Sequence, residues 1–154
     1  MLLLKNLVFT LLVPGTAAVY VPLLLARGRV AVSGITFWLA IALLLIAAVI
    51  YARCAWDFAA FGRATPAPID APKKLVVRGL YRYMRNPIYV GVVIACLGWA
   101  LVFSAMNVLL YALCLALGFH LFVLLYEEPH LRRQFGDEYR AYCEEVGRWL
   151  PRFR

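Results

Sequence analysis

A basic segment at residues 73–91 runs through Asn86 and Pro87, immediately before a long apolar run. Asn is a good N-cap residue, and Pro fits the first helical position, where no backbone N–H is required. The segment therefore predicts the cationic start of a membrane helix. The N-terminus of a helix presents unpaired N–H groups and a partial positive charge, so it is a natural place for a carboxylate or a phosphate.

A pair of adjacent carboxylates, Glu127 and Glu128, stands where a later apolar run gives way to polar sequence. The helix dipole disfavours negative charge at a helix C-terminus by a few tenths to about 1 kcal/mol per group. We therefore expect a cation to meet the pair, either a ligand or one of Lys74, Arg82 and Arg85. The alternative is that the two carboxylates only solvate the end of the helix.

The composition is that of a small membrane protein. The chain has 154 residues, of which 65% are hydrophobic, and its mean hydropathy is +0.81. This is too apolar for a soluble domain of that size. The apolar runs are long enough to cross a bilayer, which takes about 20 residues. The net charge of +8 is then better explained by anionic lipid and membrane topology than by nucleic acid.

The cysteines do not suggest a metal centre or a disulfide framework. They are scattered along the chain, two of them lie inside apolar runs, and no C-x-x-C pair is present. We expect them to be packing residues and expect no metal site. They are Cys54, Cys96, Cys114 and Cys143.

The pattern predicts an all-α membrane protein with about four transmembrane helices and a C-terminal amphipathic cytoplasmic helix. Residues 1–61 would form two N-terminal transmembrane helices. Residues 62–87 would form a cytoplasmic Pro-rich linker and the basic segment. Residues 88–126 would form a transmembrane helical hairpin, and residues 127–154 a cytoplasmic tail.

Positive charge is distributed asymmetrically about these spans. Fourteen of the 16 Lys and Arg residues fall on one side of a four-span arrangement, and only Arg27 and Arg29 fall on the other. The positive-inside rule then predicts that both termini, the basic segment and the tail lie in the cytoplasm. If the first apolar run does not span, the N-terminus changes sides, but the basic segment and the tail do not.

The hairpin should bring the two chemical features together. A short uncharged turn at residues 104–107 joins its helices, so the start of the first and the end of the second share one face. Gly91, Ala95 and Gly98 form a small-residue stripe on the first helix, and such stripes let helix backbones approach closely. We therefore expect the basic helix start beside the glutamate pair. Such a pocket would suit a ligand with a carboxylate, an ammonium, a sulfonium and a flat base.

Apolar residues in the tail recur at intervals of three and four. This spacing gives one apolar stripe on a helix, with Arg and Glu on the opposite face. We expect an amphipathic helix that lies on the membrane or folds back over the cytoplasmic mouth, with Trp149 near its end as an interfacial anchor. The stripe consists of Phe135, Tyr139, Tyr142, Val146 and Trp149.

Four short motifs follow one another in the second half of the chain. They read LVVRGLY at residues 75–81, RNPIYVG at 85–91, EE at 127–128 and FGDEY at 135–139. In this order they resemble the isoprenylcysteine carboxyl methyltransferase and phospholipid methyltransferase superfamily, over residues 73–153. The superfamily consists of integral membrane enzymes that use S-adenosylmethionine. The resemblance implies a multi-pass protein of the bacterial inner membrane, with an active site that faces the cytoplasm and a tail that completes the cofactor pocket.

The resemblance also implies roles for particular residues. Glu127 and Glu128 would hold the ammonium of S-adenosyl-L-methionine or face its positive charge, and the helix start at Asn86 would hold its carboxylate. We expect Glu127, Glu128 and Arg85 to be the catalytic residues. The positions that match cofactor-binding residues are Leu75, Val76, Tyr81, Asn86, Pro87, Ile88, Tyr89, Glu127 and Glu128. For the two tyrosines, anchoring at the membrane interface is the alternative.

The methyl acceptor stays open between an isoprenylcysteine-type carboxylate and a phospholipid amine. Isoprenylcysteine enzymes have His in place of Asn86, and an Arg where this chain has Val123 and Leu124. An amine acceptor must lose a proton to a base, whereas a carboxylate needs none. His130 or a member of the glutamate pair could be that base. His120 either lines the acceptor channel or bonds a neighbouring carbonyl.

The expected partners are the bilayer and a lipophilic small molecule or lipid that enters sideways from it, with no nucleic acid. Arg82 and Arg85 could instead hold a lipid phosphate. Two rival functions fit parts of the pattern. Integral-membrane sterol reductases share a similar hairpin and tail and use a nicotinamide cofactor, although they are far longer. A non-catalytic lipid-binding or assembly subunit is the second rival.

Overall fold

The computed structural model describes residues 8, 10–57 and 75–152 of the chain. Within these residues every regular element is helical and no strand occurs, so the expected all-α fold is confirmed there. The Pro-rich linker at residues 62–72 and Lys74 lie outside the described residues. The elements are the π-helical turn η1 (Thr16–Tyr20), α2 (Val21–Leu25), α3 (Ile35–Asp57), the 3₁₀ helix η3 (Gly79–Arg82), α4 (Pro87–Val102), α5 (Met106–Phe122), the π-helical turn η4 (Val123–Glu127) and α6 (Glu128–Glu145).

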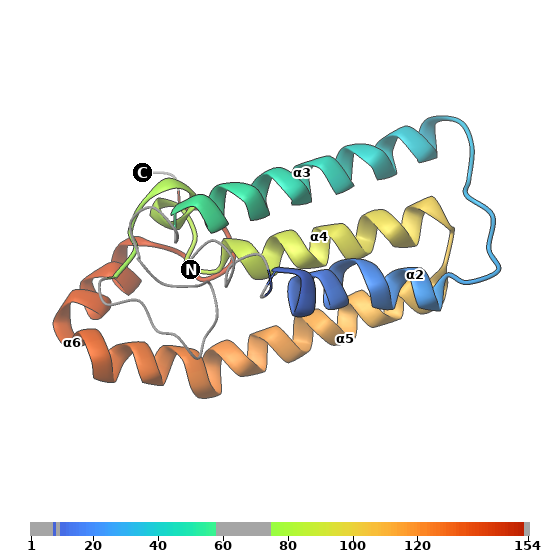
Figure 1. Cartoon of the computed structure of the whole chain (residues 1–154). Coiled ribbons are helices and arrows are strands. Elements are labelled where there is room, and N and C mark those ends of the chain that lie inside the picture. The colour runs from blue at the N-terminus through green and yellow to red at the C-terminus, as the bar shows by residue number, and fades with distance from the viewer. Residues whose placement is uncertain (1–7, 9, 58–74, 153–154) are drawn as a thin grey trace.

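Helix α4 is the centre of the bundle. It lies between α3 and α5 in Figure 1, and η1 and α2 also pack on it. A tight turn between α4 and α5 is closed by Ser104, whose φ of 46° lies in the left-handed region. The predicted hairpin is therefore present, and it brings the start of α4 to the same end of the bundle as the end of α5.

The small-residue stripe on α4 faces α3. Gly91, Ala95 and Gly98 are all buried. A Cβ atom on Gly91 would lie 3.0 Å from Ile50 Cγ2. On Gly98 it would lie 2.9 Å from Leu44 Cδ2. The stripe thus lets α3 approach α4 as closely as the sequence predicts.

We expect Gly98→Val to destabilise the protein by about 1–3 kcal/mol, because a side chain there overpacks the interface with α3. The unfolding midpoint in detergent should fall accordingly. Gly118→Val is the matched control, since a Cβ atom on Gly118 in α5 would meet no heavy atom within 4 Å. If Gly98→Val and Gly118→Val lose equal stability, the close approach of α3 and α4 is not the reason why a larger side chain at position 98 is destabilising.

Two helices are long and apolar enough to cross a membrane by length and composition. They are Ile35–Asp57 and the continuous helical stretch Met106–Glu145. Thr10–Leu25 and Pro87–Val102 are apolar but shorter. On α3, large side chains such as Leu45 and Val49 are each 62% exposed, and outward apolar surface of this kind suits contact with lipid. The helices therefore support a membrane protein.

The boundary between the hairpin and the tail is not a break in the helix. The chain passes from α5 through η4 directly into α6. Pro129 has no backbone N–H to donate to the preceding turn, and the wider π-helical turn before it accommodates this missing hydrogen bond without ending the helix. Gly136 (φ 53°, ψ −121°) interrupts the helical geometry within α6. The helix ends at Glu145, so the prediction that Val146 and Trp149 continue a helical stripe is wrong.

Beyond α6 the chain folds back to the start of α4. Val146 is extended (φ −113°, ψ 128°), and Met84 and Gly147 form an isolated parallel β-bridge. The Arg85 N–H donates to the Gly147 carbonyl at 2.9 Å. Val146 nevertheless stays buried beside Tyr139 and Tyr142, with part-buried Leu75 packed on this cluster. Extended backbone after the helix lets the tail return, which a longer helix could not do.

Candidate active site

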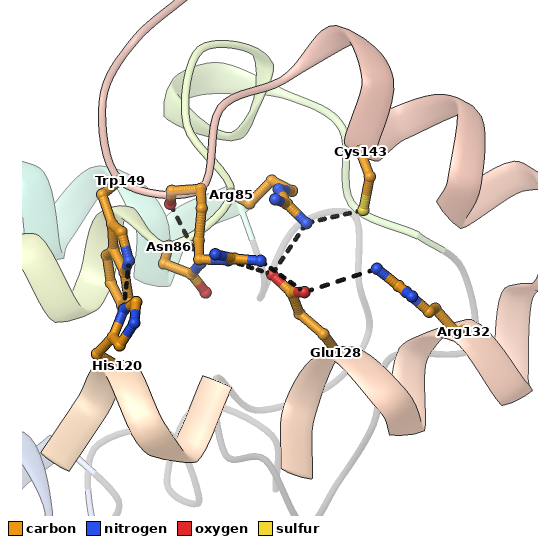
Figure 2. Close-up of polar contacts among 8 residues, drawn as sticks. Arg85, Asn86, His120, Glu128, Arg132, Cys143 and Trp149 are labelled. Carbon is orange, nitrogen blue, oxygen red and sulfur yellow. Dashed lines mark hydrogen bonds and ion pairs between the residues drawn. The ribbon is translucent and has the colours of Figure 1, made fainter. Parts of the chain in front are cut away.

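Glu128, the first residue of α6, is a buried carboxylate surrounded by three arginines (Figure 2). Its Oε1 lies 2.6 Å from Arg148 Nε and 3.0 Å from Arg85 Nη1. Its Oε2 lies 3.1 Å from Arg148 Nη2 and 3.9 Å from Arg132 Nη2. Because Glu128 is only 4% exposed, these cations neutralise a charge that would be costly to bury alone. We call these four residues the Glu128 cluster.

The pKa of Glu128 lies below its ordinary value. Burial alone would raise this pKa, but the hydrogen bonds from Arg148 and the nearby charges of Arg85, Arg148 and Arg132 outweigh it. The hydrogen bond to Glu128 in turn raises the pKa of Arg148. Glu128 is therefore ionised at neutral pH, and charge-assisted hydrogen bonds between Arg148 and Glu128 tie the tail to α6.

Arg85 connects the Glu128 cluster to the segment before α4. Its Nη1 also contacts Cys143 Sγ at 2.8 Å, and its buried Nε has no hydrogen-bond partner among the described residues. Of the cations expected to meet the glutamate pair, Arg85 does so. Arg82 instead lines a separate cavity at the end of α3, and Lys74 lies outside the described residues.

Asn86 occupies the N-cap position of α4, with Pro87 as the first helical residue, as the sequence predicts. Its side chain makes no capping hydrogen bond. Instead, Asn86 Nδ2 donates to the Arg148 carbonyl at 3.2 Å. Both ends of Arg148 are thereby fixed, the guanidinium by Glu128 and the backbone by Asn86.

Glu127 is in a different environment from its neighbour. Its Oε2 accepts a 2.8 Å hydrogen bond from the hydroxyl of Tyr89, whose ring packs on Phe119 at a centroid distance of 4.6 Å. Burial raises the pKa of Glu127; the Tyr89 hydrogen bond opposes this, and the charge of Glu128 adds to it. One member of the glutamate pair is thus neutralised by arginines, and the other is held by a tyrosine.

The remaining positions that match cofactor-binding residues divide between two apolar clusters. Val76 and Tyr81 are buried with Cys54 at the end of α3, and part-buried Ile88 packs against them. Leu75 packs on the tyrosine cluster of the tail. The Tyr81 carbonyl accepts a 2.6 Å hydrogen bond from the Tyr142 hydroxyl, which links the two clusters.

An apolar cavity of about 300 Å³ lies between α4 and α5, and one of its lining residues, Tyr89, is the hydrogen-bond donor to Glu127. Trp149 lines one side of it, and its Nε1 donates to His120 Nδ1 at 3.1 Å (Figure 2). His120 therefore lines a cavity and bonds an indole rather than a carbonyl. Trp149 contacts the hairpin. The cavity is lined by Tyr89, Val90, Val93, Ile94, Ala116, Phe119, His120 and Trp149.

Two residues of this region are missing from the sequence predictions. Arg148 is bidentate to Glu128, but it carries no signal in the helical pattern because it lies in the extended segment after α6. Asp57, the last residue of α3, is 4% exposed. A lone acidic residue directly after the apolar run of α3 is the only signal that could have marked it. His130 is exposed and stacks on Tyr126.

The chain is similar in sequence to known methyltransferases. The phospholipid methyltransferase family model matches residues 35–138, from the start of α3 into α6. A methanethiol S-methyltransferase of Mycobacterium tuberculosis is 42% identical over 72 residues, which are 47% of this chain and 28% of that protein. A phosphatidylethanolamine N-methyltransferase of Eremothecium gossypii is 37% identical over 82 residues, or 52% of this chain and 10% of that protein.

The chain thus spans well under two thirds of the length of either relative. The family match, however, covers most of the described helices, including Arg85, Tyr89 and both glutamates. The similarity to a superfamily of membrane methyltransferases that the four motifs indicate is confirmed by this match. The chain belongs to the phospholipid methyltransferase family.

Proposed function

We propose that this chain is an integral membrane methyltransferase that transfers a methyl group from S-adenosyl-L-methionine to a lipophilic acceptor in the bilayer. One observation carries the proposal. Tyr89 donates to the partly buried carboxylate of Glu127 and also lines the apolar cavity between α4 and α5. A site for a cation thus adjoins a space for an apolar molecule, which is what transfer from a cationic donor to a lipophilic acceptor requires.

The residues around Glu127 fit this cofactor. S-adenosylmethionine supplies, when bound, an electrophilic methyl group on a positively charged sulfur. Glu127 would hold its ammonium, because a partly buried carboxylate whose hydrogen-bond partner is a neutral hydroxyl is stabilised by a nearby cation. Arg85 Nε, a buried donor without a partner among the described residues, would meet the cofactor's carboxylate. Val76 and Tyr81 would pack beside the adenosine.

The two glutamates would then have separate roles. Glu127 would contact the cofactor directly. Glu128 would act as a positioning residue, because its ion pairs fix Arg85 and Arg148. Methyl transfer by in-line displacement depends largely on holding the nucleophile and the methyl carbon aligned and away from water. A rigid cluster next to the site would serve that purpose.

The acceptor would occupy the cavity between α4 and α5. Its lining is almost entirely apolar, with His120 as its one basic residue. The named relatives act on a thiol and on a phospholipid amine, so the acceptor atom varies. An isoprenylcysteine-type carboxylate or a phospholipid amine would both suit this chain. For an amine, a base would also have to take the proton.

The membrane arrangement is part of the same proposal. We infer four transmembrane spans, with the basic segment and the tail on the cytoplasmic side of a bacterial inner membrane. In this arrangement residues 1–61 form the first two spans, residues 62–87 the linker and basic segment, residues 88–126 the hairpin, and residues 127–154 the tail. The supporting observations are the apolar lengths of α3 and of the Met106–Glu145 stretch, and the charge asymmetry of the sequence.

Filling the cavity should block the acceptor without affecting the cofactor. We expect Ala116→Phe to lower kcat/KM for the acceptor by about tenfold or more. The phenyl ring would displace part of the acceptor from the cavity, and even one methylene group in an apolar pocket is worth about 1–3 kcal/mol of binding. Affinity for S-adenosylhomocysteine should be unchanged. Leu117→Phe is the control, since Leu117 is 60% exposed on the same helix. If both variants lose activity equally, or neither does, the acceptor does not use this cavity.

The function is tested by incubating the purified protein with methyl-labelled S-adenosylmethionine and total membrane lipid, followed by chromatography. We expect label in an organic-soluble product, whose base-labile or base-stable linkage separates a methyl ester from a methylated amine. The absence of any labelled product, together with lipid binding, would favour the non-catalytic rival.

A further inference from the structure

His120 offers an available polar atom to the apolar cavity between α4 and α5. The Nε1–H of Trp149 donates to His120 Nδ1 at 3.1 Å. In the part of the chain that the structure describes, this is the one hydrogen bond that the imidazole makes. Tyr89 also lines the cavity, but its hydroxyl donates to Glu127. The Nε2 atom of half-buried His120 is therefore left for a ligand.

The hydrogen bond from Trp149 determines which imidazole nitrogen carries the proton. An indole nitrogen is a donor only, so Nδ1 of His120 must be the unprotonated nitrogen that accepts the bond. In a neutral imidazole the other nitrogen, Nε2, then carries the hydrogen. An imidazolium would place one N–H against another. His120 thus presents an N–H donor and does not act as a base while this bond is made.

The tail fixes the position of Trp149. The carbonyl of Arg148, in the peptide bond to Trp149, accepts a hydrogen bond from Asn86 at 3.2 Å. The Arg148 guanidinium is bidentate to Glu128. Trp149 extends from the tail toward His120 on α5, with the two ring centroids 6.0 Å apart (Figure 2). Trp149 is therefore a positioning residue, because it orients the imidazole and selects its tautomer.

We propose that His120 is a specificity-determining residue, whose Nε2–H donates to an oxygen, such as a carbonyl oxygen, within the apolar part of the methyl acceptor. A donor in an apolar cavity favours a molecule with such an oxygen, because any other molecule leaves the donor unpaired. His120 lies seven residues before Glu127, which is about 10 Å along a helix. The oxygen would therefore lie inside the cavity rather than beside the cofactor.

The role of His120 rests on the proposed function only in that the bound molecule is taken to be the methyl acceptor. The test therefore measures binding to the full chain in detergent, without cofactor or turnover. Failure of the methyl-transfer assay would count against the proposed function and would leave this test intact. The probes are acetophenone and isopropenylbenzene, which have the same shape and differ in a carbonyl oxygen against a methylene group.

The indole N–H resonance of Trp149 reports binding by NMR, and its loss in Trp149→Phe identifies it. The quantity compared is the ratio of the two dissociation constants, because partition of each probe into detergent is the same for every variant. Ala116→Phe, which fills the cavity, should abolish binding of both probes. Unchanged binding in Ala116→Phe would mean that this cavity takes neither probe and would overturn the proposal.

His120→Asn and His120→Gln form a matched pair. The Asn amide takes the place of Nδ1 and keeps an acceptor for Trp149, whereas the longer Gln amide reaches the place of Nε2 and keeps the donor. The preference for acetophenone should fall about 3–10-fold in His120→Asn, the usual effect of losing one hydrogen bond. It should persist in His120→Gln.

The reverse result, with the preference kept in His120→Asn and lost in His120→Gln, would reduce His120 to a support for Trp149. An equal preference in the wild type and both variants would exclude the hydrogen bond to the probe. If His120→Asn does not fold, NMR of the isotope-labelled imidazole nitrogens of the wild type decides the outcome.

The chain has two histidines, so His130→Gln identifies the imidazole signals of His120. We expect the proton on Nε2, and we expect acetophenone to shift the Nε2 signal more than isopropenylbenzene does. A proton on Nδ1, or equal shifts with the two probes, would overturn the proposal.

Discussion

Glu128→Gln should destabilise the folded protein by about 3–5 kcal/mol, the usual effect of removing one partner from a buried ion pair. The amide fills the same space but leaves Arg85 and Arg148, whose side chains are 10% and 30% exposed, without their counter-charge. The tail should detach from the start of α4 because Arg148 loses its bidentate partner. Unfolding in detergent, followed by circular dichroism, measures the loss.

Asp137→Asn is the control for Glu128→Gln. Asp137 pairs with Arg140 at 3.3 Å on the same helix, but its side chain is 96% exposed, so its removal should change stability by less than about 1 kcal/mol. A Glu128→Gln protein as stable as the control would contradict the role assigned to the cluster.

The pH dependence of stability follows from the same ion pairs. The pKa of Glu128 is lower in the folded state than its ordinary value of 4.5. Its contribution is therefore fully present above pH 4.5 and is lost as the pH falls through the lower, folded-state pKa. The wild-type protein should lose stability in this acidic range, and Glu128→Gln should lose less there.

Glu127→Gln should weaken binding of S-adenosylhomocysteine by roughly 10–100-fold, because a charged hydrogen bond to the ammonium is worth about 1.5–3 kcal/mol. Stability should be nearly unchanged, since burial raises the pKa of Glu127 and the neutral form is therefore the easier one to bury. Wild-type affinity should rise with pH through this raised pKa, as the carboxylate ionises, and Glu127→Gln should lack that rise.

Glu138→Gln, which removes the same charge from an exposed position on α6, is the matched control for Glu127→Gln. Unchanged affinity in Glu127→Gln would exclude Glu127 as the ammonium partner. A loss of stability comparable to that of Glu128→Gln would make the two glutamates one structural unit, contrary to the separate roles proposed for them.

The sequence pattern predicted those features of the fold that are determined within one helix or between two consecutive helices. The Asn86–Pro87 helix start, the α4–α5 hairpin and the Gly91–Gly98 contact surface all follow from propensity and spacing within one or two helices. The meeting of Arg85 with the glutamate pair also followed, because a tight turn forces antiparallel neighbours together.

Contacts made by chain reversal could not be predicted in this way. Arg148 reaches Glu128 only because the helix stops at Glu145 and the extended tail returns, and periodicity continued the stripe through Trp149 instead. Asp57 is buried by Gly79, on the far side of a long linker. Both contacts depend on the path of the chain rather than on which face of a helix is apolar.

The division of labour between the glutamates was equally hidden in the sequence, where they are adjacent and identical. Successive helical residues point about 100° apart, so Glu128 faces the arginines and Glu127 faces Tyr89. The sequence-based expectation that both hold the cofactor stays a prediction for Glu127, and for Glu128 we propose a positioning role.

The central claim is that this protein binds a methyl-donor cofactor, and calorimetry on the wild-type chain in detergent tests it most directly. Titration with S-adenosylhomocysteine should give saturable heat with one site per chain, and titration with NADPH should give none. Binding of NADPH would contradict this claim. The absence of heat with S-adenosylhomocysteine, from protein that is shown to be folded in the detergent, would contradict it as well.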